Sequence, residues 1–167
     1  CASRLSGAIT MIDRWYAGGE SGNTVNVAFT QDLGSTRGVM RSVGNQMVFT
    51  SGFGGGHGFM FPETGIYKIE ATMSLRPSVH TAQSTYVRAQ FSEDTAATWE
   101  NVGYMKAWDS NFGIEGGGQI YVSVSMSFTL NISNTATQRL RFEFNEGNTY
   151  SSLRGGDDFS WITVTRI

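Results

Sequence analysis

The feature that most constrains the fold is the run IYVSVSMSFTLNI at positions 120–132. Every second residue is apolar, and the residues between them are Tyr121, three serines, a threonine and an asparagine. Side chains alternate between the two faces of a β-strand, whereas a helix would spread these apolar residues around its whole surface. The run therefore predicts one amphipathic strand of about 40 Å, and its length favours a bend or bulge within it.

The same alternation recurs elsewhere in the chain. The segments that show it are residues 65–75, 84–91, 101–108 and 139–145. In the third of these, Val102, Tyr104 and Trp108 share one face with Lys106. Glycine-rich links such as SGFGGGHG and EGGGQ separate the segments, and glycine permits tight reversals. This spacing predicts an all-β, two-sheet antiparallel jelly-roll sandwich of about 8–10 strands.

The C-terminal segment FSWITVTRI is apolar on both faces. Phe159 and Trp161 point one way if the segment is a strand, and Ile162 and Val164 point the other way. A strand with apolar groups on both faces needs a cover on both. The opposite sheet covers one face, so a neighbouring subunit is the simplest cover for Phe159 and Trp161. The alternative is an isolated exposed aromatic residue, which is common on protein surfaces.

Composition narrows the class further. A chain of 167 residues fits one domain with a sizeable core. Charged residues make up 16%, below the average of about 25%, while 21 glycines and 13% aromatics favour strands joined by tight turns. The net charge of −2 comes without a run of Lys or Arg, so we expect no nucleic-acid partner. The sequence also contains no apolar run long enough for a membrane span.

The N-terminal region gives a weaker signal. We expect residues 1–30 to form an N-terminal arm or the first strands, with packing on a partner as one use of an arm. Residues 31–167 then form the jelly-roll domain. Cys1 is the one cysteine, which excludes an intramolecular disulfide. We expect a processed or fragment start without a signal peptide, and a lipidated lipoprotein N-terminus is the alternative.

No residue pattern points to catalysis or metal binding. The nucleophile pattern G-x-S-x-G does not occur, and neither His57 nor His80 has a His or Cys neighbour at zinc-ligand spacing. The carboxylate pairs Glu93–Asp94 and Asp157–Asp158 fit solvated loops better than a calcium or acid–base site. We therefore expect no enzymatic activity, no metal and no cofactor.

The segment FMFPETGIYKIE resembles a known signature. It is similar to the central signature of the globular head of complement component one-q, whose fold is shared with the tumour necrosis factor superfamily. Phe59, Gly65 and Tyr67 match the signature, and Ile69 stands where Phe or Tyr is usual. Pro62 with Gly65 suits a turn before a buried strand, in which Tyr67 would bury its ring and find a partner for its hydroxyl.

The likeness extends over about residues 45–167 through this motif and the order of the strands. Bacteriophage structural proteins carry domains of similar style. The resemblance implies a non-enzymatic homotrimeric virion structural protein, such as a capsid decoration (cement) protein or the head domain of a head or tail fibre. Expected partners are other virion proteins and a host surface glycan. The alternatives are a bacterial surface or secreted adhesin or lectin, and a sandwich enzyme that would need two facing carboxylates.

The resemblance also suggests where contacts would form. The candidate trimer-interface residues are Tyr121, Phe159 and Trp161. Aromatic residues on loops or strand edges could stack on sugars, although packing is the commoner use of such rings. The candidate ligand contacts of this kind are Trp99, Trp108 and Tyr150.

Overall fold

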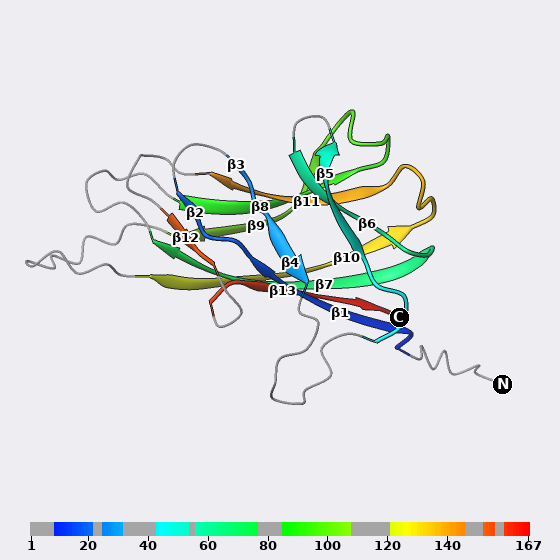
Figure 1. The fold of residues 1–167 in the computed structure, drawn as a ribbon, viewed down its shortest axis with the longest axis horizontal. Helices are drawn as coiled ribbons and strands as arrows, with labels where there is room; N and C mark the ends of the chain where they lie inside the picture. Colours follow the sequence, from blue (N-terminus) through cyan, green and yellow to red (C-terminus); the bar gives the residue numbers. More distant parts are fainter. Residues whose placement is uncertain are drawn as a thin grey trace, which may run out of the picture.

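The computed structural model describes residues 9–21, 25–31, 43–53, 56–76, 85–107, 121–145, 152–155 and 159–167. These residues form thirteen β-strands in two antiparallel sheets that face each other (Figure 1). The predicted all-β, two-sheet sandwich is confirmed. Over the same residues, no helix has the length and hydropathy needed to cross a bilayer.

The strands divide between a seven-stranded and a six-stranded sheet. The seven-stranded sheet contains β1 (Met11–Ala17), β2 (Glu20–Ser21), β4 (Phe29–Gln31), β7 (Gly65–Arg76), β10 (Val122–Ile132), β12 (Ser152–Arg154) and β13 (Trp161–Arg166). The six-stranded sheet contains β3 (Val25–Asn26), β5 (Val48–Phe53), β6 (Gly56–Met60), β8 (Thr85–Ser92), β9 (Glu100–Ala107) and β11 (Arg139–Asn145). The total exceeds the predicted number because β2, β3, β4 and β12 have only two or three residues each.

Strand β7 organises the seven-stranded sheet. One of its edges pairs with β10 from Val122 opposite Leu75 to Ile132 opposite Gly65, without a shift of register. Its other edge pairs with β13 and β12 one after the other. A bulge, one of the two irregularities predicted within residues 120–132, is therefore absent from Val122 to Ile132, because β10 pairs residue for residue with the twelve-residue strand β7.

Bulges occur in the six-stranded sheet instead. One register shift lies between Ser51 and Phe53 of β5. The other lies in β9, where Ala89 of β8 faces Gly103 and Gln90 faces Asn101, so that Val102 has no opposite residue.

In β9, Met105 and Ala107 are buried, while Tyr104 is 51% exposed. Tyr104 is thus on the solvent side of the sheet, whereas Val102 packs against the core. The prediction that Val102 and Tyr104 share a face is wrong, because the register shift at Val102 interrupts the alternation. Trp108 lies outside the described residues.

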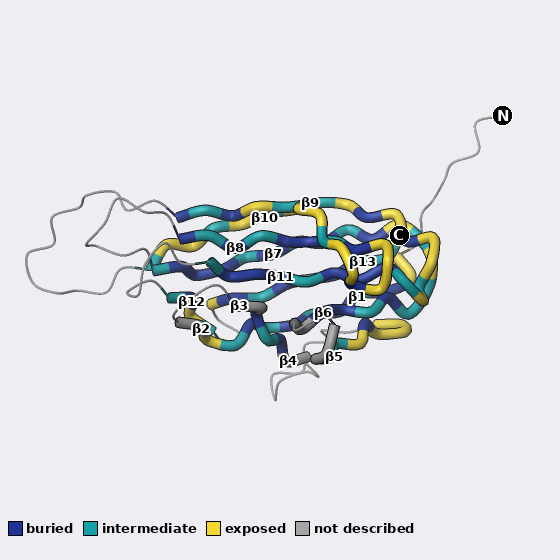
Figure 2. The backbone as a smooth tube through the Cα atoms, turned by 90° about the horizontal axis from the view of Figure 1, so that it is seen from above, coloured by how far each residue is buried: buried dark blue, intermediate teal, exposed yellow. Residues whose placement is uncertain are grey.

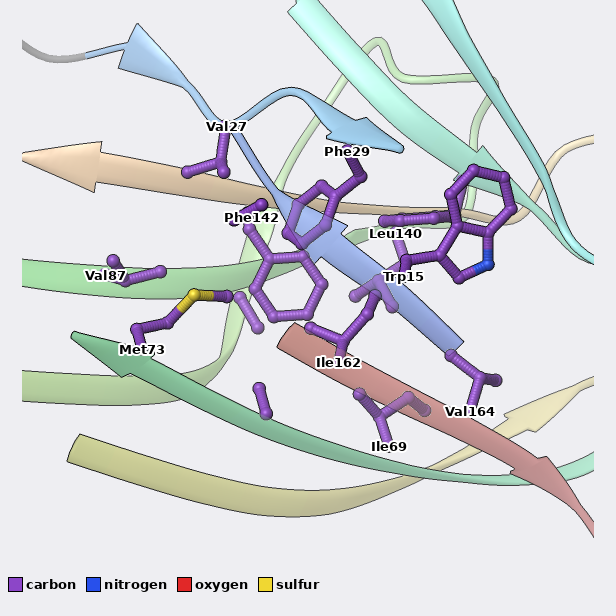
Figure 3. Close-up of a cluster of buried hydrophobic side chains, with 14 of the residues drawn as sticks. Trp15, Val27, Phe29, Ile69, Met73, Val87, Leu140, Phe142, Ile162 and Val164 are labelled. Atoms are coloured by element: carbon purple, nitrogen blue, oxygen red, sulfur yellow. The ribbon is translucent and has the colours of Figure 1, made fainter. Parts of the chain in front are cut away.

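The core lies between the two sheets and is rich in aromatic side chains (Figure 3). The ring of Trp15 from β1 meets that of Phe59 from β6 edge to face, with 5.2 Å between centroids. Such pairs add about 0.5–1.5 kcal/mol beyond the burial of their area. Ile162 and Val164 of β13 are fully buried, which confirms the inward face predicted for this strand.

The described residues of the 1–30 segment belong to the two sheets. Strand β1 lies between β13 and β4, and β3 pairs with β11. Asp13 on β1 is buried and accepts a hydrogen bond of 2.8 Å from the backbone N–H of Met47. This bond ties the stretch before β5 to the seven-stranded sheet.

The turn between β6 and β7 is built around Gly65, whose φ is +144°. A Cβ at this position would lie 2.8 Å from Nε of Arg166. The Arg166 guanidinium donates to the carbonyl of Thr64 and pairs with the Glu63 carboxylate at 2.6 Å. Tyr67 is fully buried and donates a 2.7 Å hydrogen bond to the Glu63 carbonyl, as predicted for its hydroxyl. Burial raises the pKa of this hydroxyl.

Gly65→Ala tests this turn. An L-residue at this φ is strained and its Cβ would displace Arg166, so the free energy of unfolding should fall by about 1–3 kcal/mol. Gly19→Ala is the control, because a Cβ there meets its nearest atoms at 3.6 and 3.7 Å, an ordinary contact. Urea denaturation at fixed protein concentration measures both variants. Equal midpoints for the two variants would contradict this account of the turn.

Candidate functional site

Strand β10 forms an edge of the seven-stranded sheet, because among the described strands it pairs with β7 alone. Its eleven residues include no charged residue, no proline and no glycine. The unpaired N–H and C=O groups of a sheet edge attract other strands. Edge strands therefore normally carry charged residues, proline or a bulge, which prevent such pairing. The edge of β10 is thus chemically unprotected over its whole length.

The apolar side of β10 is only partly covered (Figure 2). Leu130 and Ile132 are buried, whereas Val122 is 38% exposed. The side chains between them are partly buried and pack against the rim of the core, and they are Val124, Met126 and Phe128. The alternation in the sequence identified the strand, but the burial of its first half is incomplete within one chain.

The gap between the edge strands of the two sheets is narrow because of Gly103 on β9. A Cβ at this position would lie 2.6 Å from Sδ of Met126 and 3.1 Å from the ring of Phe128. The absence of a side chain at Gly103 lets these two residues of β10 lie directly against β9. The edges of both sheets are thereby brought together along one side of the sandwich (Figure 2).

The outward side of the seven-stranded sheet is lined by small polar residues beside this edge. We call it the serine face, and its residues are Thr72, Ser123, Ser125 and Ser127. The hydroxyls of Thr72 and Ser125 lie 3.0 Å apart across the two strands. Small side chains leave the surface flat, so another surface can approach it closely.

The predicted interface residues lie at one end of this face. The guanidinium carbon of Arg154 is 3.5 Å from the ring centroid of Phe159 and 5.3 Å from that of Tyr121. The ring of Trp161 contacts a second arginine: the guanidinium carbon of Arg14 lies 4.9 Å from its centroid. The fold therefore gathers Tyr121 and Phe159 around one cation and gives Trp161 another. Each such contact contributes about 0.5–1 kcal/mol at an exposed site.

Neither arginine was predicted as part of this cluster. Arg154 lies in a glycine-rich link and Arg14 in a weakly patterned N-terminal segment, so no local pattern marks them. Their positions depend on the pairing of β13 with β1 and of β12 with β7. These pairings join residues far apart in the sequence.

Trp99 is the one candidate ligand contact within the described residues, since Trp108 and Tyr150 lie outside them. Its half-buried ring is covered by Arg141, whose guanidinium carbon is 4.1 Å from the ring centroid. The loop before Trp99 contains Thr95 and Ala96 at positive φ values of 61° and 67°. Non-glycine residues in this region cost about 1 kcal/mol or more each, so other contacts must hold the loop.

Asp94 supplies some of those contacts. Its carboxylate accepts hydrogen bonds from the hydroxyl and the backbone N–H of Thr98, at 2.7 and 2.8 Å, and from the hydroxyl of Ser92 at 2.8 Å. These bonds lower the pKa of Asp94 from 3.8 to about 2, with the Thr98 hydroxyl as the largest cause. The Asp94 carboxylate thus helps to order the loop that presents Trp99. The backbone N–H of Thr95 also donates to the Thr137 carbonyl, and that of Ala96 to the Ser92 hydroxyl, both at 2.9 Å.

The described residues contain no cluster of three or more His, Cys, Asp or Glu placed to hold a metal ion. His57 lies in β6, while Cys1, His80 and the pair Asp157–Asp158 lie outside the described residues.

Comparisons with known proteins identify the architecture. No protein-family model and no curated protein matches the sequence. The structure of Eiger TNF from S. frugiperda matches with a TM-score of 0.64 at 12% identity, over 96% of this chain and 94% of that chain. The crystal structure of murine APRIL at pH 8.0 matches with a TM-score of 0.61 at 10% identity, over 94% of this chain and 98% of that chain.

The fold is a jelly roll of the tumour necrosis factor type. At these identities the likeness concerns the fold. The resemblance read from Phe59, Gly65 and Tyr67 is confirmed at that level, and the complement and bacteriophage parts of it stay predictions. Within this jelly roll, the serine face and the edge of β10 belong to the same sheet.

Asp94→Asn tests the electrostatic part of the loop. The pKa of this carboxyl is lower in the folded chain, so its stabilisation is present above pH 3.8 and is lost as the pH falls through about 2. We expect the variant to melt at a lower temperature than the wild type near neutral pH. The difference should shrink between these two pH values.

Calorimetric scans at several pH values measure the melting temperatures. Glu93→Gln is the control, because it removes a charge from the same turn without removing any of the three hydrogen bonds to Asp94. A difference between Asp94→Asn and the wild type that is the same at every pH would argue against this assignment.

Proposed function

We propose that this chain is a non-enzymatic structural or binding module that assembles as a homotrimer through the edge of β10. The observation that carries the proposal is an eleven-residue edge strand without charge, proline or bulge, whose apolar side is half covered. A second copy covers both features at once. It removes the remaining apolar surface of β10 from water, at about 25 cal/mol for each Å².

The contact joins two different surfaces. The edge of β10 on one copy packs on the serine face and the arginine–aromatic cluster of the next, where Tyr121, Phe159 and Trp161 lie. A contact between unlike surfaces is heterologous, and it closes into a ring when the rotation between copies permits. The resemblance to the one-q head and to the tumour necrosis factor superfamily supports a ring of three.

Three carboxylates of the described residues support a non-enzymatic role, because they are engaged in ion pairs with basic side chains. Glu143 is paired with Arg88, Glu63 with Arg166 and Glu70 with Lys68. A glycosidase would need two carboxylates facing one cleft, roughly 5–9 Å apart. Carboxylates bound in structural ion pairs do not suit that task.

We further propose that the trimer belongs to a bacteriophage virion, as a capsid decoration protein or as the head of a head or tail fibre. The low content of charge and the phage-like style of residues 59–70 and 159–167 support this location. A bacterial surface or secreted adhesin is the alternative. Mass spectrometry of purified particles from the source of the gene separates the two: the chain should be found in virions, in copy numbers divisible by three. Recovery from the bacterial envelope alone would favour the adhesin.

Val122→Glu tests the assembly. The substitution places a carboxylate on the edge that a second copy covers, and burial of an unpaired charge costs several kcal/mol. Because about 1.4 kcal/mol weakens association tenfold, we expect the trimer to dissociate to monomers at micromolar concentration. Light scattering coupled to size-exclusion chromatography measures the mass.

Val48→Glu is the matched control, since Val48 is 55% exposed and lies on β5 of the other sheet. It should leave the trimer intact. A wild-type chain that is monomeric at these concentrations, or equal masses for the two variants, would refute the proposed assembly.

A further inference from the structure

The solvent side of the six-stranded sheet carries a pair of stacked tyrosines. The rings of Tyr86 on β8 and Tyr104 on β9 lie 4.9 Å apart at an angle of 31°. Val87 and Met105, the next residues on each strand, are buried, so the two tyrosines point away from the core. Because half of Tyr104 is exposed, this pair presents aromatic surface to solvent.

Two arginines stand beside the tyrosines in fixed orientations. Arg88 lies opposite Tyr104 on one side and opposite Glu143 on the other, and its Nε donates to the Glu143 carboxylate at 2.7 Å. Arg141 on β11 donates from Nε to Oε1 of Gln90 at 2.8 Å. Each guanidinium is thus held through Nε by a neighbouring strand. A held guanidinium loses little rotamer freedom when it binds a planar anion.

Trp99 closes the other end of this surface. It stacks on Arg141, while Gln90 connects Arg141 to Asn101 through a 3.1 Å hydrogen bond from Nε2 to Oδ1. The hydrogen bonds to Asp94 help to order the loop that carries the indole. Aromatic rings therefore flank two oriented arginines on one flat surface, which we call the arginine–tyrosine face and define by Tyr86, Arg88, Trp99, Tyr104 and Arg141.

The charge of this face differs from that of the whole chain. Lys106 lies opposite Tyr86 in the register of β8 and β9, so it belongs to the same side. Arg88 and Arg141 share the carboxylate of Glu143, so these three side chains together carry one net positive charge, whereas the whole chain has a net charge of −2. The face is complementary to an anion.

We propose that the arginine–tyrosine face binds an acidic saccharide, a sugar that carries a carboxylate. The C–H face of a pyranose ring packs on an aromatic ring, and a carboxylate accepts paired hydrogen bonds from a guanidinium. The tyrosine pair and the arginines supply both partners side by side. The proposal goes beyond the assembly proposed above and does not rest on it, because these residues lie on the opposite sheet from the serine face.

Ligand-observed NMR and calorimetric titration of the full chain test this site. The probes are 3′-sialyllactose, tri-galacturonate and lactose, which separate sialylated glycans from uronate polymers and both from a neutral sugar. We expect saturable binding of at least one acidic saccharide, with lactose at least about tenfold weaker, a difference of about 1.4 kcal/mol. Absence of saturable binding, or equal affinity for lactose, would overturn the proposal.

Variants locate the binding. Tyr104→Ala should lower the affinity for the acidic saccharide about tenfold, because the exposed ring of Tyr104 is half of the stacking surface. The chain has two lysines, which form a matched pair: Lys106→Gln should weaken binding a few-fold, and Lys68→Gln on the other sheet should not change it. Thermal melts confirm that each variant is folded. Affinity that is unchanged in both Tyr104→Ala and Lys106→Gln would exclude this face. If the chain is monomeric and still binds the acidic saccharide, the proposed trimer is refuted while the proposed binding site is supported.

Discussion

The pairing of β10 with β7 along eleven residues is the constraint on which the other features depend. It places every apolar residue of β10 on the inner side of the sheet and every serine on the outer side. The other edge of β7 pairs with β13 and β12. Among the described strands, β10 pairs with β7 alone and is therefore an edge of the sheet. One hydrogen-bonded ladder thus creates both the flat serine face and the unprotected edge beside it.

The two sheets use arginine in different ways. On the seven-stranded sheet, Arg14 and Arg154 cover aromatic rings at one end of the serine face. On the six-stranded sheet, Arg88 and Arg141 are held by a carboxylate and an amide of neighbouring strands. The first arrangement suits packing against a copy of the chain, and the second suits recognition of an anion. A sandwich allows both because its two outer faces are independent surfaces.

Much of the fold could be predicted from local patterns, while the contacts could not. The alternation in residues 65–75 and 139–145 identified two strands, and Tyr67 was expected to bury its ring and to bond its hydroxyl, as it does. The stacking of Tyr86 on Tyr104 was missed, because the register of β8 with β9, in which Arg88 lies opposite Tyr104, decides which residues meet. Nothing local to either tyrosine specifies that register.

The sequence by itself determined that this chain forms alternating strands, where the main ones lie, and which residues share a face in strands without a bulge, because side-chain direction in a strand depends on local backbone geometry. Only the tertiary structure decided that β10 is an edge, that its apolar side stays half covered from Val122 to Phe128, and that Tyr104 faces solvent. Pairing partners are set by hydrogen bonds between segments far apart in the chain. The position of a strand within its sheet therefore leaves no periodic trace in the sequence.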